Sequence, residues 1–449
     1  MGRLFLATSL VTVALGAALA PLSAVAGPEA MDATAARHLL SRPGFGATPA
    51  ELTEFTGLSY EAGVDAILAG LSPEPSRPMP PWATAWAYPY EEIHALGQTA
   101  EELFFTYRYR EIEDLTAWWI TEMITTPSPL TERLTLYWHD HFATSFDQDE
   151  NPQWMATQNA LFRRHGAGNF ADLARGILRD PAMLSWLSNT ENLAEAPNEN
   201  LAREYLELFT LGEGRGYTEA DVKEAARALT GASVNPLQGA RYAFYEEDHD
   251  RGRKTILGLK GRWGPDDLAN IVLSHDAFVP YIVERLWLGF VSDTPDPEEI
   301  DRLAALWKAE DLELQPLLRA LFLTEAFWAE ENRGRLIKSP VELLVGTVRS
   351  LGLPAIDAGL LGALSADLGQ QLFFPPNVGG WPGGTEWISD ASSLARAAFL
   401  QELFYSAEEA APEAQAPSMM GTMAPQSPAS APSGAADTEI AQVFALGFE

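Results

Sequence analysis

The sequence predicts an all-α protein, a multi-helix globular domain with at most one small β-hairpin near residues 241–257. Apolar residues recur at helical spacing through most of residues 32–405. Many of these segments open with a Ser, Thr, Asp or Asn cap, often followed by Pro. The alternation of strands and helices typical of a parallel sheet is missing. With 47% hydrophobic residues among 449, the chain can bury one large core or two merged ones.

The segment Pro197–Gly212 predicts one amphipathic helix at the centre of the domain. Asn198 or Asn200 can cap its first turn, and Gly212 stands where a left-handed C-terminal cap belongs. Its buried stripe consists of Leu201, Tyr205, Leu208 and Phe209. Its other face carries Glu199, Arg203, Glu204 and Glu207.

Taken in order, the first half of the chain predicts helices with recognisable ends. Thr48, Pro49 and Glu51 form a capping box, and Gly166 closes a helix whose last turn is basic. Residues 71–89, rich in Pro and Trp, predict an ordered loop. The aromatic run from Phe104 to Trp119 is interpreted as core. The expected helices are 32–40, a restart at 48–51, 60–69, 101–125, 128–142, 151–165, 169–179 and 181–188.

The second half contains the predicted hairpin, in which residues 241–246 pair with residues 254–257 around a polar turn. Ser339 to Glu342 is the clearest capping box in the chain. Residues 375–384, rich in Gly and Pro, must form a loop. The expected helices are 218–229, 265–273, 276–290, 297–309, 315–325, 340–352, 358–371 and 390–405.

The two ends differ from this domain, which we place at residues 27–406. Residues 1–26 match a secretory signal peptide with a small-x-small cleavage site, so we expect a periplasmic or secreted protein. Residues 407–436 have the Ala/Pro/Ser composition of a disordered linker. Residues 437–449 form a short amphipathic peptide, which either docks on a partner or folds back on its own domain.

Composition excludes several classes of function. The chain has 30 Lys and Arg against 62 Asp and Glu, a net charge of -32, which argues against nucleic acid and anionic lipid as partners. It has no Cys, and therefore no disulfide, thiol nucleophile or thiolate metal site. After the signal peptide no apolar run is long enough to span a membrane. Serine nucleophile elbows, phosphate-cradling loops and His-Glu-x-x-His are also missing.

His139 and His141 are the first candidate metal ligands, with Glu204 as a third. A His-x-His pair chelates a divalent metal when the chain is extended, but on a helix the two rings point about 200° apart. A shared metal therefore requires that the helix end near Trp138. The alternative is one buried and one exposed histidine.

The polar face of the central segment is the candidate catalytic group. Glu199, Arg203 and Glu204 offer paired carboxylates beside a guanidinium, which suits acid/base work. The same spacing equally suits an intrahelical charge ladder on a solvated face. The segment Asp248–Asp250, followed by Lys254, suits a turn with local hydrogen bonds, or a small polar site. The loop with Trp381 and Trp387 offers aromatic faces to a ligand, or simple packing.

The chain resembles a bacterial domain-of-unknown-function family, number 1800, over about residues 31–405. The resemblance is carried by several specific blocks. They are residues 36–40 with 44–46, 138–145, 158–159 with 163–165, 180–184, 197–212, 217–231, His249 and Asp250 with Lys254, 338–342, and 375–378 with 380–381.

The resemblance implies a secreted protein, with a co-exported sulfatase-like or phosphatase-like protein as partner. It also implies a polar site built from the family's motif positions, although it supplies no reaction. One departure is Asp140, where the family more often has Asn. The implied positions are His139, His141, His165, Glu199, Asn200, Arg203, Glu204, Glu207 and Asp250.

Two hypotheses follow. The first is an enzyme, a metal-assisted hydrolase whose site gathers the histidines with Glu199, Arg203 and Glu204, and whose binding residues include Asn200, Glu207, His165, Asp250 and Trp381. The second is a non-catalytic partner of a co-exported enzyme, which uses the Trp-rich loops or residues 437–449.

Overall fold

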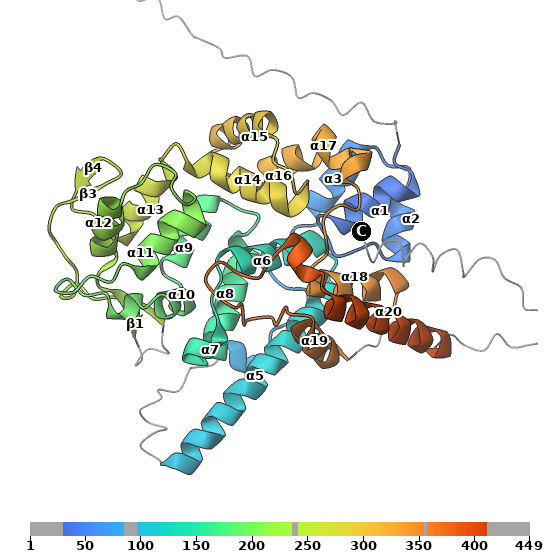
Figure 1. Cartoon of the computed structure of the whole chain (residues 1–449), viewed down its shortest axis with the longest axis horizontal. Coiled ribbons are helices and arrows are strands. Elements are labelled where there is room, and N and C mark those ends of the chain that lie inside the picture. The colour runs from blue at the N-terminus through green and yellow to red at the C-terminus, as the bar shows by residue number, and fades with distance from the viewer. Residues whose placement is uncertain (1–29, 85–96, 236–240, 354–356, 411–449) are drawn as a thin grey trace, which may run out of the picture.

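The computed structural model describes residues 30–84, 97–235, 241–353 and 357–410, and these residues are mostly helical (Figure 1). The all-α prediction is confirmed. Most apolar side chains gather in two clusters, which we call the first core and the second core. The predicted signal peptide, nearly all of the predicted linker and the peptide 437–449 lie outside the described residues. Within the described residues, no helix is both long and apolar enough to cross a membrane.

The chain begins with three short helices on the first core. Thr48 and Glu51 form the predicted capping box, because the Thr48 side chain accepts from the Glu51 N–H while the Glu51 side chain accepts from the Thr48 N–H. A single 3-10 turn interrupts the loop that follows. These elements are α1 (Ala33–Ser41), α2 (Pro49–Phe55), α3 (Tyr60–Ala69) and η1 (Pro81–Thr84).

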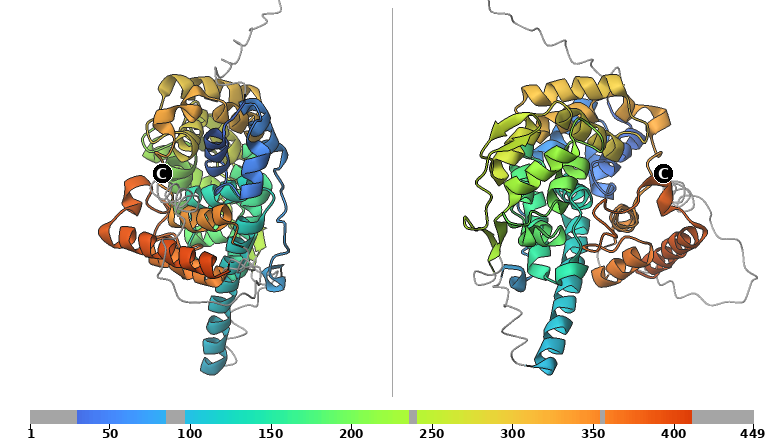
Figure 2. Two further views of the ribbon diagram at one scale, coloured as in Figure 1. Left: turned by 90° about the vertical axis from the view of Figure 1, so that its right-hand side faces the viewer. Right: turned by 60° about the vertical axis from the view of Figure 1, so that its left-hand side comes forward.

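Helix α5 (Gln98–Thr125) is the longest helix described, and its N-terminal half projects from the body (Figure 2). The interpretation of its aromatic run as core is wrong for this half. Tyr107 and Tyr109 are 59% and 41% exposed, whereas Trp118 and Trp119 are buried in the second core. The helix therefore changes from projecting to buried along its length.

Helix α6 (Pro129–His141) lies in the middle of the molecule and separates the two cores (Figure 1). Leu134 and Trp138 pack in the first core, and Leu136 packs in the second. The helix continues to His141, so it does not end near Trp138. The helices that follow are α7 (Phe146–Asp149), α8 (Pro152–His165), α9 (Phe170–Ile177), α10 (Pro181–Trp186) and the 3-10 turn η2 (Asn189–Glu191).

The central segment is helical but not one continuous α-helix. It consists of α11 (Asn200–Glu204) and the π-helical turn η3 (Tyr205–Thr210), in which the Leu211 N–H donates to the Leu206 carbonyl five residues back. The wider turn shifts the register, so Leu206 is fully buried and Leu208 only partly. Helix α12 (Glu219–Leu229) follows, opened by the predicted capping box at Thr218.

Two of the four described strands, β2 (Arg241–Phe244) and β3 (Lys254–Ile256), lie where the sequence predicts strands, but they pair with strands that the sequence did not predict. Strand β2 pairs antiparallel with β1 (Ala232–Asn235), and β3 pairs antiparallel with β4 (Leu259–Gly261). The predicted pairing of 241–246 with 254–257 is therefore wrong. Each strand pairs with its nearest neighbour in sequence, so two small sheets replace the single hairpin.

Helices α13 to α17 complete the first core, and α18 to α20 build most of the second with α5. The loop at 375–383 is free of helix and strand, as predicted. The remaining elements are α13 (Pro265–Leu273), α14 (Phe278–Phe290), α15 (Pro297–Ala309), α16 (Leu314–Phe322), α17 (Glu325–Trp328), η5 (Glu330–Asn332), α18 (Pro340–Leu351), α19 (Ala358–Asp367), η6 (Gly384–Trp387) and α20 (Asp390–Ala410).

Candidate functional site

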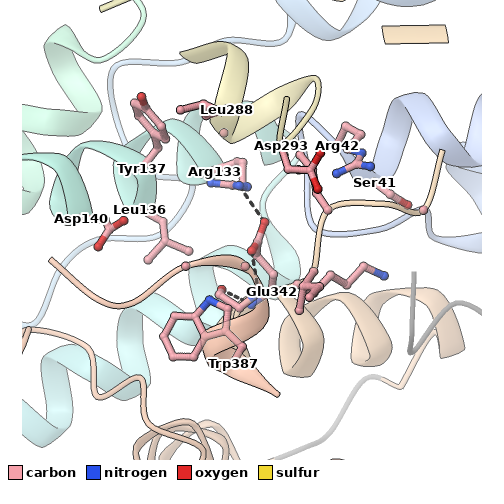
Figure 3. A pocket seen from close by; sticks show the side chains of 18 of the residues that line it. Ser41, Arg42, Arg133, Leu136, Tyr137, Asp140, Leu288, Asp293, Glu342 and Trp387 are labelled. Atoms are coloured by element: carbon pink, nitrogen blue, oxygen red, sulfur yellow. Dashed lines mark hydrogen bonds and ion pairs between the residues drawn. The ribbon is translucent and has the colours of Figure 1, made fainter. Parts of the chain in front are cut away.

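A cavity of about 430 Å³ opens between helices α1, α6 and α14, the start of α18, and the loop that ends in η6 (Figure 3). We call it the arginine cavity. Helical periodicity explains its walls, because residues at i, i+3, i+4 and i+7 share one face. On α6 this face carries Arg133, Leu136, Tyr137 and Asp140.

The lining of this cavity is basic although the protein is acidic. Six Lys and Arg side chains line it against three Asp and Glu, in a chain whose net charge is -32. The basic residues are Arg37, Arg42, Arg133, Arg285, Arg333 and Lys338, and the acidic residues are Asp140, Asp293 and Glu342.

Two of the acidic residues already have partners. The Arg133 guanidinium contacts Glu342 Oε1 at 2.7 Å, and the Glu342 Oε2 accepts from the Ser339 N–H at 2.9 Å (Figure 3). Burial alone would raise the pKa of Glu342, but Arg133 and the Ser339 N–H hold it below its ordinary value. Asp293 pairs with Arg335, outside the lining.

Arg285 makes no ion pair with an acidic side chain of the described residues. Its Nε is buried without a hydrogen-bond partner among these residues. Arg285 lies on α14, and its positive charge acts to lower the pKa of the Asp140 carboxyl. Arg285 is half-buried and lines the cavity, so its guanidinium is placed to pair with an anion that enters there.

Asp140 is held by the loop that follows Gly380. Its Oδ1 accepts from the Trp381 N–H at 2.8 Å. Burial raises the pKa of Asp140 to about 6, although the Trp381 N–H, Arg285 and Arg133 all oppose the rise. Gly380 has a φ of +84°, and a Cβ there would lie 2.6 Å from the Asp140 carbonyl oxygen and closer still to its Oδ1. Only glycine allows this approach.

Tyr137 lines the cavity where α6 packs against Gly289 of α14. Its hydroxyl is buried without a hydrogen-bond partner among the described residues, and burial raises its pKa. Gly289 allows the two helices to close over it, because a Cβ at that position would lie 2.8 Å from the Tyr137 ring. The ring stacks parallel to the imidazole of His141.

The predicted metal set of His139, His141 and Glu204 is not assembled. The two histidines lie on α6 and point to different sides, as two positions on a helix must. The His141 Nε2 donates to the Phe209 carbonyl at 3.0 Å, whereas the His139 Nε2 accepts from the Phe373 N–H at 3.2 Å. Burial lowers the pKa of each to about 3, so both are neutral. No group of three metal-binding side chains gathers anywhere in the described parts of the chain.

The predicted catalytic residues form a charge network at the surface. Arg203 contacts Glu199 and Glu207 at 3.2 Å each and Glu219 at 2.7 Å, which ties α11 and η3 to α12. Glu204 is half-buried, and burial followed by Glu207 raises its pKa. This is the charge ladder that the spacing also predicted, and a catalytic role for these residues stays a prediction. The central segment reaches His141 through Phe209, whose carbonyl accepts from the imidazole and whose ring lies 6.3 Å from it, and not through its acids or Arg203.

The predicted binding residues are scattered. Asn200 is exposed, and His165 is half-buried in the last turn of α8. Asp250 pairs with Arg227 at 2.6 Å and caps the turn before β3. Among the predicted site residues, Trp381 alone lines the arginine cavity, and its ring also contacts His139.

Arg133 and Arg285 belong to none of the predicted sites, and Arg37 was noted only within the family block 36–40. They come from helices far apart in the sequence, so no local motif joins them. A weaker pattern was present, because Arg133, Tyr137 and Asp140 interrupt an apolar helix at i, i+4 and i+7. A polar stripe on a helix that is otherwise buried indicates a cavity or a polar contact.

Comparison with protein families tests the family resemblance that the sequence blocks suggested. Residues 38–444 match the family described as "Protein of unknown function (DUF1800)". The chain belongs to the DUF1800 family. The match extends beyond the predicted limit of 405, so the DUF1800 region includes the segment interpreted as a linker. Comparison with curated proteins and comparison with solved structures gave no significant match.

Proposed function

We propose that this DUF1800 protein binds a small oxyanion in the arginine cavity. The observation that carries the proposal is Arg285, a guanidinium with a buried, unpaired Nε in a basic cavity of an acidic protein. The planar guanidinium fork matches carboxylate, phosphate and sulfate groups. A volume of about 430 Å³ also lies in the range of small-molecule sites.

The lining suggests a ligand with one anionic end. Arg42 and Arg333 donate to the backbone carbonyls of Asn332 and Trp328 at 2.8 and 3.1 Å. These bonds orient the two guanidinium groups in the lining. Trp381 and Trp387 supply aromatic surface elsewhere in the lining of the cavity. An anionic group on the arginines and a less polar remainder on the indoles would use both parts of the lining.

The test is anion binding to the full chain and to Arg285→Met. We expect phosphate, sulfate or acetate at millimolar concentration to raise the unfolding midpoint, because a ligand that binds only the folded state stabilises it. Arg285→Met keeps the length of the side chain and removes its charge, so binding should weaken at least about tenfold, which corresponds to 1.4 kcal/mol.

The matched control is Arg302→Met on α15, whose guanidinium pairs with Glu299 on its own helix, away from the cavity. This variant should bind anions as the wild type does. The proposal fails if none of the three anions binds, or if both variants lose binding equally.

We also propose that the protein is exported, on the evidence of residues 1–26. Recovery from the periplasm or medium of a chain that begins at Gly27 would support this, and recovery from the cytoplasm with Met1 retained would contradict it. The metal-assisted hydrolase is not part of the proposal, because its ligand set does not come together.

A second candidate is a protein-binding role, which the projecting half of α5 favours, and the co-exported sulfatase-like protein is the partner that the family resemblance implies. Leu103 and Tyr107 are 54% and 59% exposed there, and exposed apolar side chains on a projecting helix suit a protein contact. The tagged wild-type protein should capture the partner from the native cell envelope. The double variant Leu103→Ser with Tyr107→Ser should no longer capture it. Leu360→Ser, at a residue 56% exposed on α19, is the control. If the wild type, the double variant and Leu360→Ser capture the partner equally, the projecting half of α5 is not the binding surface.

A further inference from the structure

We propose that Asp140 selects among the anions that enter the arginine cavity, and that the cavity prefers an oxyanion that carries a proton, inorganic phosphate, over sulfate. The inference rests on the anion site proposed above. It concerns which ligand that site accepts, and it follows from what the two oxygens of one carboxyl group can do.

The geometry leaves one oxygen of Asp140 for the ligand. The Trp381 N–H occupies Oδ1 at 2.8 Å, and among the described residues no hydrogen bond reaches Oδ2. Figure 3 shows Asp140 beside Leu136 on the α6 wall. Gly380 fixes this arrangement, because the loop approaches the carboxyl too closely for any other residue. The carboxyl therefore cannot turn away when an anion enters.

The charged and titratable groups around Asp140 lie on several of the helices that line the cavity. Arg133 and Tyr137 lie on its own helix, Arg285 on α14 and Glu342 on α18. His38 on α1 is neutral, because burial lowers its pKa to about 3. The arginines draw an anion toward Asp140, and the carboxylate repels it unless a proton lies between the two oxygens.

The source of that proton distinguishes the ligands. Inorganic phosphate keeps a proton at neutral pH and can donate it to the charged carboxylate, as O–H···O⁻. Sulfate has no proton, so Asp140 must take one from solvent and donate it. The carboxylate gains an O–H bond to a proton that the solvent or buffer gives up, and this O–H then donates to the sulfate oxygen, so sulfate binding takes up one proton from solution.

The expected preference follows from the position of Asp140 on the pH scale. Because the pKa of Asp140 is about 6, protonating it at pH 7.5 costs about 1.5 pH units, or about 30-fold in the affinity for sulfate. At pH 5 the carboxyl is already protonated, and this cost disappears. A carboxylate of ordinary pKa would favour phosphate over sulfate more strongly, because its protonation at pH 7.5 would cost more. An amide at this position would not favour either anion.

The experiment is calorimetric titration of the full chain with inorganic phosphate and with sulfate at pH 7.5 and pH 5. At pH 7.5 we expect phosphate to bind about 30-fold more tightly than sulfate, and at pH 5 we expect the two affinities to lie within about threefold. Titrations in buffers of different ionisation enthalpy should show uptake of one proton per sulfate at pH 7.5, and none per phosphate.

Asp140→Asn is the decisive variant, since the amide has the shape of the carboxyl and can donate to sulfate without a proton. It should bind sulfate about 30-fold more tightly than the wild type at pH 7.5 and lose the preference for phosphate. Asp65→Asn, on a surface carboxylate paired with Arg319, should keep the wild-type preference.

Three outcomes separate the two proposals. If neither anion binds the wild type, the anion site itself is rejected. If both bind, and Arg285→Met weakens both, but wild-type affinities are equal at pH 7.5, the site stands and the role of Asp140 is rejected. The same rejection follows if Asp140→Asn keeps the preference. The pH comparison uses the wild type alone, so it decides the matter even if Asp140→Asn does not fold.

Discussion

At the scale of single residues, Gly380 and Asp140 depend on each other. The positive φ of Gly380 turns the loop so that the Trp381 N–H reaches Asp140 Oδ1. A side chain at position 380 would strain the backbone and also collide with the Asp140 carbonyl oxygen and carboxyl. The loop and the carboxyl are thus fixed by one residue that has no side chain.

We therefore expect Gly380→Ala to lower the free energy of unfolding by about 1–3 kcal/mol, and to weaken anion binding as the loop withdraws. Denaturant unfolding and phosphate titration measure the two effects. The control is Gly383→Ala in the same loop, where a Cβ meets no atom within 4 Å and φ is -108°. Equal stability of the two variants would contradict the close approach.

Sequence reasoning found part of this site and missed the rest for a physical reason. The block 138–142 was singled out for its histidines, but these are neutral core side chains, and the residue between them faces the cavity. Trp381 was predicted because a Gly/Pro loop with indoles is locally recognisable. Arg37 and Arg285 carry no local pattern, since only the packing of α1 and α14 brings them to α6.

At the scale of elements, the π-helical turn η3 changes which side chains the central segment buries. In a continuous α-helix, Leu208 would lie on the stripe with Leu201 and Tyr205. The extra residue in the turn instead buries Leu206, which has no exposed surface, and leaves Leu208 at the edge of the first core. The periodicity of the sequence alone does not reveal a π turn, because both leucines are equally apolar.

This register predicts an order of stabilities. Leu206→Ala should lower the free energy of unfolding by about 2–5 kcal/mol, the range for a fully buried leucine, and Leu208→Ala by about half as much or less. Urea unfolding of the two variants measures the difference. The two changes are chemically identical, so each is the control for the other, and the reverse order would indicate a continuous α-helix.

The strands show a second limit of sequence reasoning at this scale. The segments 241–244 and 254–256 were recognised by their β-forming residues. Their partners were wrong because Leu257 and Gly258 both adopt positive φ, which closes a tight turn directly after β3. Leucine is rare in that conformation, so the turn had no recognisable sequence pattern.

At the scale of the whole molecule, α6 is the element on which both cores and the cavity depend. Its two apolar faces pack in different cores, and its third face lines the cavity. The helix boundaries and caps followed from local residues, and most of them agree with the structure. The arrangement of α1, α14 and α18 around α6 did not follow, because it depends on contacts between residues hundreds of positions apart.

The buried titratable groups give the molecule two opposing responses to pH. Burial lowers the pKa of His38, His139 and His141 to about 3, so stability is lost as pH falls below the ordinary value of 6.5. Burial raises the pKa of Asp140 and Asp180 to about 6 and about 7, so the stability of their neutral forms is lost as pH rises through these values. Because three histidines outweigh two carboxyls, these five groups together should make the protein less stable as the pH falls below 6.5.

Asp180 offers a test of the second response, the loss of stability as a buried carboxyl ionises with rising pH. It caps α10, where its Oδ2 accepts from the Met183 N–H and from Gln158 while its Oδ1 has no partner among the described residues. Asn caps a helix as well as Asp does and cannot ionise. From pH 5 to pH 8, the wild type should lose stability relative to Asp180→Asn, on the order of 2–3 kcal/mol, because only the wild type must bury a charge.

Urea unfolding at several pH values measures this divergence. Asp266→Asn is the control, since this carboxylate pairs with Arg179 at the surface and is 56% exposed. Its curve should run parallel to that of the wild type, because an exposed ion pair at the surface contributes little to stability. If the Asp180→Asn curve also ran parallel, Asp180 would be ionised in the folded protein throughout, and the solvent would have to reach its Oδ1.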